Sequence, residues 1–213
     1  MVKLLWVSLW GVKMNKLVIV GASGHGKVVA DIASLVGYED IVFLDNNPEL
    51  KECLGYPVLG SDKLLNDIAG DVFIAIGNSE IRMKLMNQFA NRNFPILIHP
   101  SAIVAKSVQI EAGSVVMAGA VINPDTKVGK GVIVNTSCSI DHECVINDFC
   151  HVSVGSHLAG NVVVGEVSWI GAGAIVSNNI KISSGCIIGA GAVVIRDIDA
   201  KGTYIGVPAR KIK

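Results

Sequence analysis

The sequence has no excess of charge of either sign, because 18 lysine and arginine residues balance 18 aspartate and glutamate residues. A nucleic-acid-binding protein normally carries a basic surface, so we expect no nucleic-acid partner. At 213 residues with 51% hydrophobic content, the chain is long enough to bury two cores. These features favour a protein that handles small ligands.

The five cysteines lack the spacing of a zinc or disulfide framework. No Cys-x-x-Cys motif occurs, and Cys138, Cys144 and Cys150 are spaced by six residues. Six is also the step of the repeat described below, so these three thiols should fall on different faces of a coil. We therefore expect no metal site and no disulfide, and free thiols suit a reducing cytoplasm.

Long apolar runs are also missing. The opening segment, residues 1–13, is apolar and contains Trp6 and Trp10, but it is too short to span a bilayer and lacks a signal-peptide cleavage site. Met14-Asn15-Lys16 leads directly into a strand-like run. We expect residues 1–13 to be an extension outside the fold, with no insertion into a membrane.

An aliphatic residue recurs every six positions through the second half of the chain, from Ile98 to Val194, without a change of register. This period fits neither an amphipathic helix nor a single alternating strand. It predicts a triangular solenoid in which each hexapeptide forms one short strand and one corner, and residues eighteen apart stack about 4.8 Å from one another. Glycines recur three places after the aliphatic positions, where a tight corner can require a positive φ.

The first half has a different pattern. Apolar runs at 17–20, 41–44 and 72–76 alternate with helical stretches at 27–36 and 81–90, which predicts a small parallel, Rossmann-like α/β domain over residues 14–94. Pro95 and Pro100 mark its boundary with the solenoid of residues 95–213. Ligands of parallel sheets bind at the carboxyl ends of the strands, where the sequence has GASGHG (21–26), Asp45-Asn46 and Gly77-Asn78.

His142 is the strongest candidate for chemistry. It lies at a predicted corner beside Glu143, and a carboxylate on one ring nitrogen would make the other a better general base. The same spacing also fits a solvent-exposed His–Glu pair on a turn with no role in chemistry. Gly160 lies eighteen residues later, one coil along at the same corner, where its N–H is a candidate oxyanion donor. Base and donor would then serve acyl transfer.

The GASGHG segment is a weaker signal. It is not the G-x-G-x-x-G dinucleotide fingerprint, and no second dehydrogenase domain follows. On spacing alone, His25 fits a structural turn residue as well as a ligand contact. His151 and His157 each precede an aliphatic position. We expect a groove contact for His151 and an ordinary surface position for His157.

Three segments together resemble a known family: the six-residue ladder, the closing GVPAR (206–210), and NTSCSIDHECVINDFCHVSVGSHLAGNVVVG (135–165). They are typical of the left-handed β-helix acyltransferases. With GASGHG, the chain resembles the bacterial sugar acetyltransferases that N-acetylate UDP-4-amino-4,6-dideoxy sugars for bacillosamine synthesis. The left-handed coil direction is implied by this resemblance alone.

The resemblance implies an acetyl-CoA-dependent N-acetyltransferase that works as a homotrimer in the cytoplasm, without a metal. By the same likeness, His142 is the general base and Glu143 tunes it. The positions that match acetyl-CoA contacts are His151, Gly160, Ala172 and Ala190. Those that match the nucleotide-sugar pocket are Ser23, Gly24, His25, Asp45, Asn46 and Gly77.

Other functions remain open at this stage. Sialic acid O-acetyltransferases share the two-domain layout. A hydroxyl acceptor must lose its proton to the base as it attacks, whereas a neutral amine attacks first and sheds its proton afterwards. A different class of function is a metal-binding or purely structural solenoid. In the metal-binding case, three histidines would meet across a subunit boundary to bind zinc. The choice among UDP, GDP and dTDP rests on overall resemblance, which favours UDP.

Overall fold

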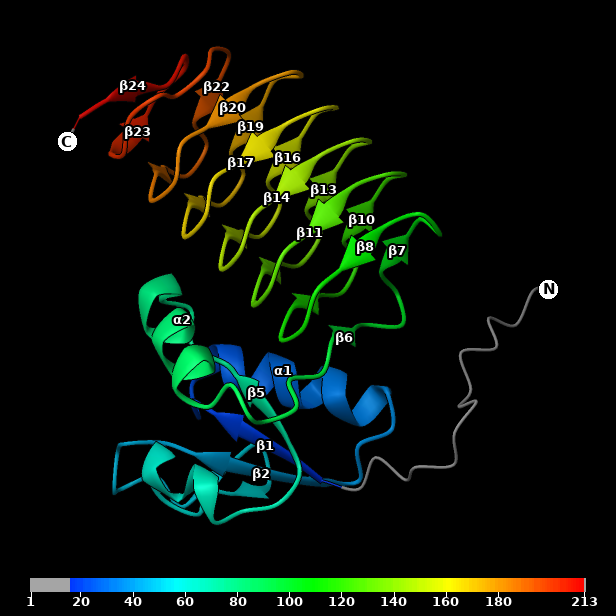
Figure 1. The fold of residues 1–213 in the computed structure, drawn as a ribbon, viewed down its shortest axis with the longest axis vertical. Coiled ribbons are helices and arrows are strands. Elements are labelled where there is room, and N and C mark those ends of the chain that lie inside the picture. The colour runs from blue at the N-terminus through cyan, green and yellow to red at the C-terminus, as the bar shows by residue number, and fades with distance from the viewer. Residues whose placement is uncertain (1–15, 213) are drawn as a thin grey trace.

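The computed structural model describes residues 16–212, which form an α/β domain followed by a long β-solenoid (Figure 1). The segment 1–13, expected to be an extension, lies outside the described residues. The last helix of the α/β domain ends at Gln88 and the first strand of the solenoid begins at Leu97. None of the helices in residues 16–212 is long and apolar enough to cross a membrane.

The α/β domain is built on a three-stranded parallel sheet in the order β2-β1-β5. Its strands are short apolar runs that are almost completely buried. The sheet and its helices comprise β1 (Lys16–Val20), α1 (Gly24–Leu35), β2 (Asp40–Leu44), β5 (Asp71–Ile74) and α2 (Ser79–Gln88). A small hairpin, β3 (Glu52–Cys53) with β4 (Tyr56–Pro57), and a 3-10 helix, Asp62–Asn66, complete the domain.

The element types expected from the sequence are confirmed, but some boundaries were wrong. Helix α1 begins at Gly24, three residues before the predicted start, because Ser23 already has the extended backbone of an N-cap. Strand β5 ends at Ile74, two residues early. Ala75 N still donates to Val20 O at 2.8 Å, after which the chain turns away through Gly77.

The solenoid has three faces of parallel two-residue strands, and each strand pairs with the strand eighteen residues on. Face one contains β6 (Leu97–Ile98), β9 (Val115–Val116), β12 (Ile133–Val134), β15 (His151–Val152), β18 (Trp169–Ile170) and β21 (Ile187–Ile188). Face two contains β7 (Ile103–Val104), β10 (Val121–Ile122), β13 (Ser139–Ile140), β16 (His157–Leu158), β19 (Ile175–Val176) and β22 (Val193–Val194). Face three contains β8 (Gln109–Ile110), β11 (Lys127–Val128), β14 (Val145–Ile146), β17 (Val163–Val164) and β20 (Lys181–Ile182).

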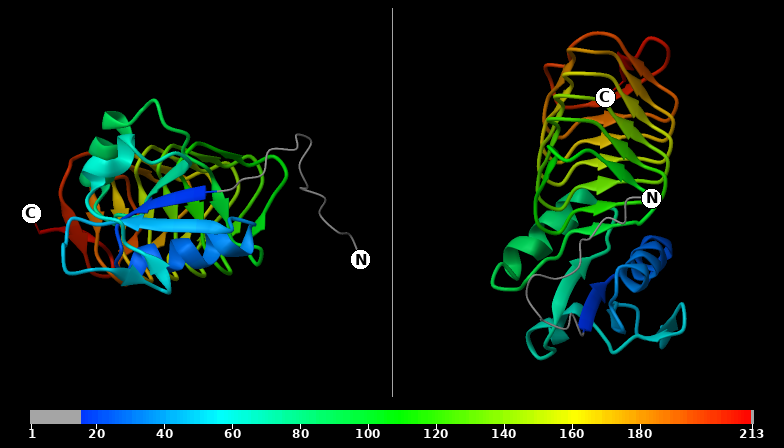
Figure 2. Two further views of the ribbon diagram at one scale, coloured as in Figure 1. Left: turned by 90° about the horizontal axis from the view of Figure 1, so that it is seen from below. Right: turned by 90° about the vertical axis from the view of Figure 1, so that its right-hand side faces the viewer.

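The predicted aliphatic ladder forms the core of the solenoid. Its first three members, Ile98, Val104 and Ile110, are partly buried against that core, and the other fourteen are buried within it. Figure 2 shows the coils stacked in register above the α/β domain. The prediction of a solenoid with a six-residue step is confirmed.

The corners repeat with the same period. From Gly113 to Gly191, every sixth residue has a positive φ, and seven of these fourteen residues are glycine. The others include Glu143, Phe149 and Val167, with φ of 58°, 58° and 59°. A β-branched side chain rarely adopts this conformation, so the stacked coils must hold Val167 in it.

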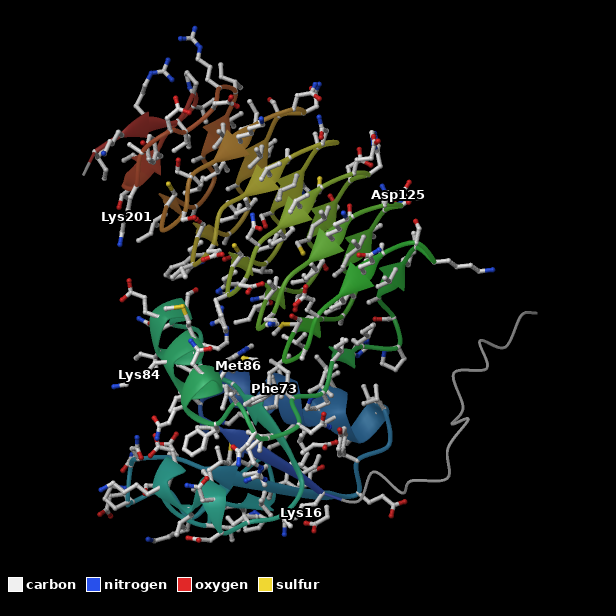
Figure 3. All side chains as sticks on the ribbon, in the orientation of Figure 1. Lys16, Phe73, Lys84, Met86, Asp125 and Lys201 are labelled. Carbon is white, nitrogen blue, oxygen red and sulfur yellow. The ribbon has the colours of Figure 1, made fainter. Side chains whose placement is uncertain are left out.

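The α/β domain and the solenoid share buried surface. Side chains at the start of face one, including Leu97, Val115 and Ile133, are buried in one cluster with α1. Met86 of α2 packs with Phe149 and Val167 at the corner between faces three and one. Figure 3 shows Met86 between α2 and the first coils. Two apolar clusters therefore join the two halves.

The C-terminal segment covers the last coil on all three faces. On face one, β23 (Thr203–Ile205) pairs with β21, and β24 (Arg210–Lys211) then pairs antiparallel with β23. On face two, Val193 N donates to Gly206 O at 3.1 Å, and Ala209 N donates to Val193 O at 2.8 Å. On face three, Ile182 forms a bridge with Ile198. The strands of the last coil thus have backbone partners within the chain.

Candidate functional site

His142 projects from the corner between faces two and three. Its Nδ1 lies 3.0 Å from Oε2 of Glu143, and both side chains are more than half exposed. The ring covers Gly160 one coil along: a Cβ at Gly160 would lie 2.7 Å from both Cε1 and Nε2 of His142. The pairing and the stacking expected from the sequence are both present. Figure 3 labels Asp125, which lies at the same corner one coil earlier and shows that this corner is on the side of the solenoid away from α2.

Neighbouring groups fix the backbone that carries His142. Oδ1 of Asp141 accepts hydrogen bonds from His142 N and from Asn123 Nδ2, each at 2.8 Å. The hydrogen bonds from Asn123 and from the backbone of His142 lower the pKa of Asp141. Glu143 N donates to Pro124 O at 3.0 Å, which holds Glu143 in its left-handed conformation. The histidine and its carboxylate are thus presented by an ordered corner.

Three of the sequence-predicted cofactor positions have unused backbone donors. Gly160, Ala172 and Ala190 each stand two residues after an aliphatic ladder position, and their N–H groups donate to no acceptor within residues 16–212. Ala172 and Ala190 stack at the corner between faces one and two, where Gly191 N donates to Ala172 O at 2.8 Å. Free N–H groups on successive coils are available to a carbonyl-rich ligand.

A hollow of about 270 Å³ lies on face two beside the His142 corner. Its polar wall includes Asn123, Asp141, Ser139 and His157. Ser139 Oγ lies 2.8 Å from Nδ1 of His157, one coil away. His157 is exposed, as expected, and it also lines this hollow. The period of eighteen, which stacks His157 on Ser139, is the signal that could have placed it there.

A second hollow, of about 450 Å³, lies at the carboxyl ends of β1, β2 and β5. The predicted residues Ser23, Asp45, Asn46 and Gly77 line it, together with Lys84 of α2, which the sequence did not single out. Asp45 is held by the backbone, since its carboxylate accepts from Ala22 N at 2.8 Å and from Asn47 N at 2.9 Å. It therefore shapes the glycine-rich turn as well as facing the hollow.

His25 and His151 lie where α1 meets face one. Burial, aided by the positive charge of Arg82, lowers the pKa of His25 to about 4 and that of His151 to about 3, so both rings are neutral at neutral pH. His151 stacks on Trp169 with ring centroids 5.7 Å apart, and Asn135 Nδ2 lies 3.1 Å from its Nε2. Nε2 of His25 is buried without a hydrogen-bond partner within residues 16–212. A buried nitrogen of this kind is a place for a ligand group to bind.

The predicted site residues therefore form three separate groups within one chain. His142, Glu143 and Gly160 lie at the corner between faces two and three, which is across the prism from face one. His151 lies on face one, close to His25 at the start of α1. Ala172 and Ala190 occupy a third place, the corner between faces one and two. One chain does not bring all of the predicted residues together.

The structure assembles no metal site in the part of the chain that it describes, since no three His, Cys, Asp or Glu side chains in residues 16–212 are placed to hold an ion. All five cysteines are free and buried. Burial raises the pKa of Cys138 and Cys150 to about 12, so these thiols are protonated at neutral pH. They act as small apolar side chains.

Known proteins share this arrangement over nearly the whole chain. The acetyltransferase domain of PglB from Neisseria gonorrhoeae FA1090 is 42% identical and superposes with a TM-score of 0.90, covering 92% of this chain and 99% of that one. The family profile described as the PglD N-terminal domain matches residues 16–89. This chain belongs to the PglD family of hexapeptide-repeat sugar N-acetyltransferases.

Other relatives in the PglD family differ in the nucleotide sugar named for them. UDP-N-acetylbacillosamine N-acetyltransferase from Bacillus subtilis is 36% identical over 115 residues, which is 49% of this chain and 52% of the relative, so the match spans about half of each protein. PerB from Caulobacter crescentus, solved in complex with CoA and GDP-perosamine, is 37% identical, with a TM-score of 0.88 over 93% of this chain and 97% of that chain. The PglB domain has also been solved with acetyl coenzyme A.

Proposed function

We propose that this protein transfers the acetyl group of acetyl-CoA to the 4-amino group of a UDP-linked amino-dideoxy sugar. The observation that carries the proposal is the His142 corner, where Nδ1 faces Glu143 at 3.0 Å and the ring lies over Gly160. Membership of a sugar N-acetyltransferase family supports the reaction class. The choice of UDP follows the bacillosamine-type relative, although PerB was solved with a GDP sugar.

The corner supports a direct transfer in one attack. The neutral amine adds to the thioester carbonyl, and the resulting oxyanion accepts a hydrogen bond from the free N–H of Gly160. Nδ1–H of His142 donates to Glu143, which leaves the lone pair of Nε2 to accept the proton that the amine sheds. The C–S bond then breaks, and the proton held on His142 can return to the CoA thiolate. Amide and free thiol are the products.

The α/β domain supplies the features for nucleotide recognition. Helix α1 begins at Gly24 with no acidic residue in its first turn, and the N-cap Ser23 makes no capping bond with its side chain. Its N–H groups and the Ser23 hydroxyl are therefore open to a diphosphate. Asn46 and Gly77 line the same hollow, and in the first turn of α1 Nε2 of His25 has no hydrogen-bond partner among residues 16–212. We assign the nucleotide sugar to this region and acetyl-CoA to the solenoid, at His151, Gly160, Ala172 and Ala190.

Complete active sites then require more than one chain. His142 lies across the prism from His151 and His25, so a sugar held by the α/β domain of one copy reaches a base only on a neighbouring copy. A closed threefold ring would create three such sites. The large apolar side chains left exposed on face two, Ile103 at 66% and Ile175 at 45%, fit a surface that a second copy covers. The substrates and the free thiols both suit the cytoplasm.

A thiol-release assay tests the reaction. Acetyl-CoA is offered with a panel of UDP-, GDP- and dTDP-linked 4-amino sugars and with free sialic acid. We expect CoA release with a UDP-linked 4-amino sugar and none with sialic acid. Release with sialic acid alone would replace N-acetylation by O-acetylation, and no release with any acceptor would remove the proposal.

A complementation assay tests the shared site. His142→Ala and His151→Ala chains are each expected to be nearly inactive as purified oligomers. Mixed by unfolding and refolding together, they should recover part of the wild-type turnover, because some interfaces then combine an intact His142 with an intact His151. Mixtures that stay inactive, or an active monomer in sedimentation, would contradict the shared site.

A further inference from the structure

Arg82 is an unusual buried residue in this chain. It lies on α2, its side chain is 1% exposed, and it is among the largest fully buried side chains of the described residues. No aspartate or glutamate within residues 16–212 forms an ion pair with it. Burial lowers its pKa to about 10, so the guanidinium remains charged at neutral pH. A buried charge without a counter-ion is costly unless its donors are satisfied.

The guanidinium meets this need with oxygens from both halves of the protein. Toward the solenoid, Nε donates to Gly131 O at 2.6 Å, and Nη2 donates to Phe149 O at 2.8 Å and Cys150 O at 3.4 Å. Toward the α/β domain, Nη1 donates to Ile76 O at 2.8 Å and Gly77 O at 3.2 Å. A rigid planar fork is suited to holding acceptors at fixed separations.

The acceptors on the two sides belong to the two substrate regions. Ile76 and Gly77 line the hollow at the strand ends. Cys150 directly precedes His151 in the chain, so its carbonyl belongs to the peptide unit that leads into β15. One side chain thus ties the backbone of the proposed nucleotide pocket to the backbone that carries a proposed acetyl-CoA contact. Arg92 offers a contrast, because all its acceptors, the carbonyls of Leu65, Ile68 and Gly70, lie inside the α/β domain.

We propose that Arg82 is a positioning residue that sets the separation between the nucleotide-sugar pocket and His151, and so aligns the acceptor amine with the acetyl group. The inference rests on the proposed function. It goes further by giving one residue, remote from the chemistry, control over how the two substrates meet. A displacement of about 1 Å between reacting groups costs roughly 10²-fold in rate.

The kinetic test compares Arg82→Met and Arg82→Lys with Arg92→Met. For Arg82→Met we expect kcat to fall about 10- to 100-fold, while the Kd values for free UDP and for acetyl-CoA stay within about 3-fold of wild type. Arg82→Lys keeps the charge but not the planar guanidinium, so its kcat should lie between that of the wild type and that of Arg82→Met. Arg92→Met should lower the melting temperature while kcat stays at the wild-type value.

Two results would overturn the proposal. One is an Arg82 variant that turns over at the rate of Arg92→Met. The other is a loss of UDP affinity in proportion to kcat, which would make Arg82 a support of the pocket alone. If Arg82→Met does not fold, the same criteria apply to Arg82→Lys.

A fluorescence titration separates this inference from the proposed function. Trp169 stacks on His151, and the titratable groups that face His151 are Arg82 from α2, which is charged at neutral pH, and His25 from α1, which is neutral there. In a Trp6→Phe, Trp10→Phe background, Trp169 is the remaining tryptophan, and protonation of His151 should quench it. Burial is the larger cause of the low pKa of His151 and remains in Arg82→Met, so we expect the transition to move to a higher pH in that variant than with Arg82 present, while still lying below the ordinary histidine range. Identical titrations would show that Arg82 does not control His151, even if the wild-type enzyme acetylates its sugar.

Discussion

Replacing Gly160 with alanine should impair catalysis by moving a side chain on the next coil. The added Cβ would lie 2.7 Å from Cε1 and Nε2 of His142, whereas ordinary contacts begin at 3.4 Å. The ring must therefore retreat by about 0.7 Å or rotate off the glycine. The backbone itself tolerates the change, since the equivalent corner position is already alanine at Ala112, Ala118, Ala172 and Ala190.

The expected magnitude follows from that displacement. A misplacement of about 1 Å at a reacting group costs roughly 10²-fold, so a shift of this size predicts a fall in kcat of about 10- to 100-fold. Stability should change little, because the His142 side chain is exposed and can move into solvent. The affinity for acetyl-CoA should also change little, since alanine keeps the N–H at this corner. The loss should therefore fall on kcat.

A double-mutant cycle measures whether the loss passes through His142. Thiol release is followed for wild type, Gly160→Ala, His142→Ala and the double variant. We expect His142→Ala to lower turnover about 10²- to 10⁴-fold, as the loss of a general base should. In that background, Gly160→Ala should cost almost nothing more, because no ring remains to be displaced. Additive losses in the double variant, or full activity in Gly160→Ala, would refute the reasoning.

Further predictions concern the carboxylate, the buried histidines and the corners. Glu143→Ala should lower kcat less than loss of the histidine, and an equal loss in the thiol-release assay would make Glu143 more than a tuning group. The unfolding free energy should fall as pH drops from 6.5 towards 4, because His25 and His151 bind protons in the unfolded chain at pH values where they stay neutral in the folded protein. Urea unfolding at pH 7 and at pH 5 measures this fall. Replacing both histidines by glutamine should reduce the difference in unfolding free energy between the two pH values. Gly155→Ala, at φ 61° with open space around it, should cost about 1–2 kcal/mol, while Gly131→Ala should cost about 1–3 kcal/mol more, because its Cβ would meet an aromatic ring at 2.7 Å; equal urea midpoints for the two variants would contradict this.

Periodic features were predictable from the sequence, because they depend on local spacing. The ladder from Ile98 to Val194 and the stacking of His142 on Gly160 follow from a step of six and a coil of eighteen. The same arithmetic separates His142 from His151, since nine residues are one and a half steps and lead to a different part of the prism. Spacing alone therefore locates a residue on the solenoid with good accuracy.

Contacts between the two halves were not predictable in this way. Nothing in the sequence around Arg82 differs from an ordinary amphipathic helix, and its partners on the solenoid are backbone carbonyls 49 to 68 residues away. Every residue has a backbone carbonyl, so a buried arginine whose long-range partners are all carbonyls has no partner that the sequence identifies. The lowered pKa values of His25 and His151 follow from the same packing and could not be inferred from spacing.

The C-terminal cover on the last coil has a consequence for the behaviour of the protein at high concentration. Parallel strands stacked in register are also the building plan of a fibril, and an open end with free N–H and C=O groups can recruit another chain. Here one end of the stack is buried beneath α1, and at the other end the strands β23 and β24, the bridge at Ile198 and the turn at Gly206 occupy all three faces. The antiparallel strand β24 breaks the parallel register, so a further coil has no matching edge on which to add. The last residues of the chain therefore act as a stop to polymerisation as well as a closure of the core.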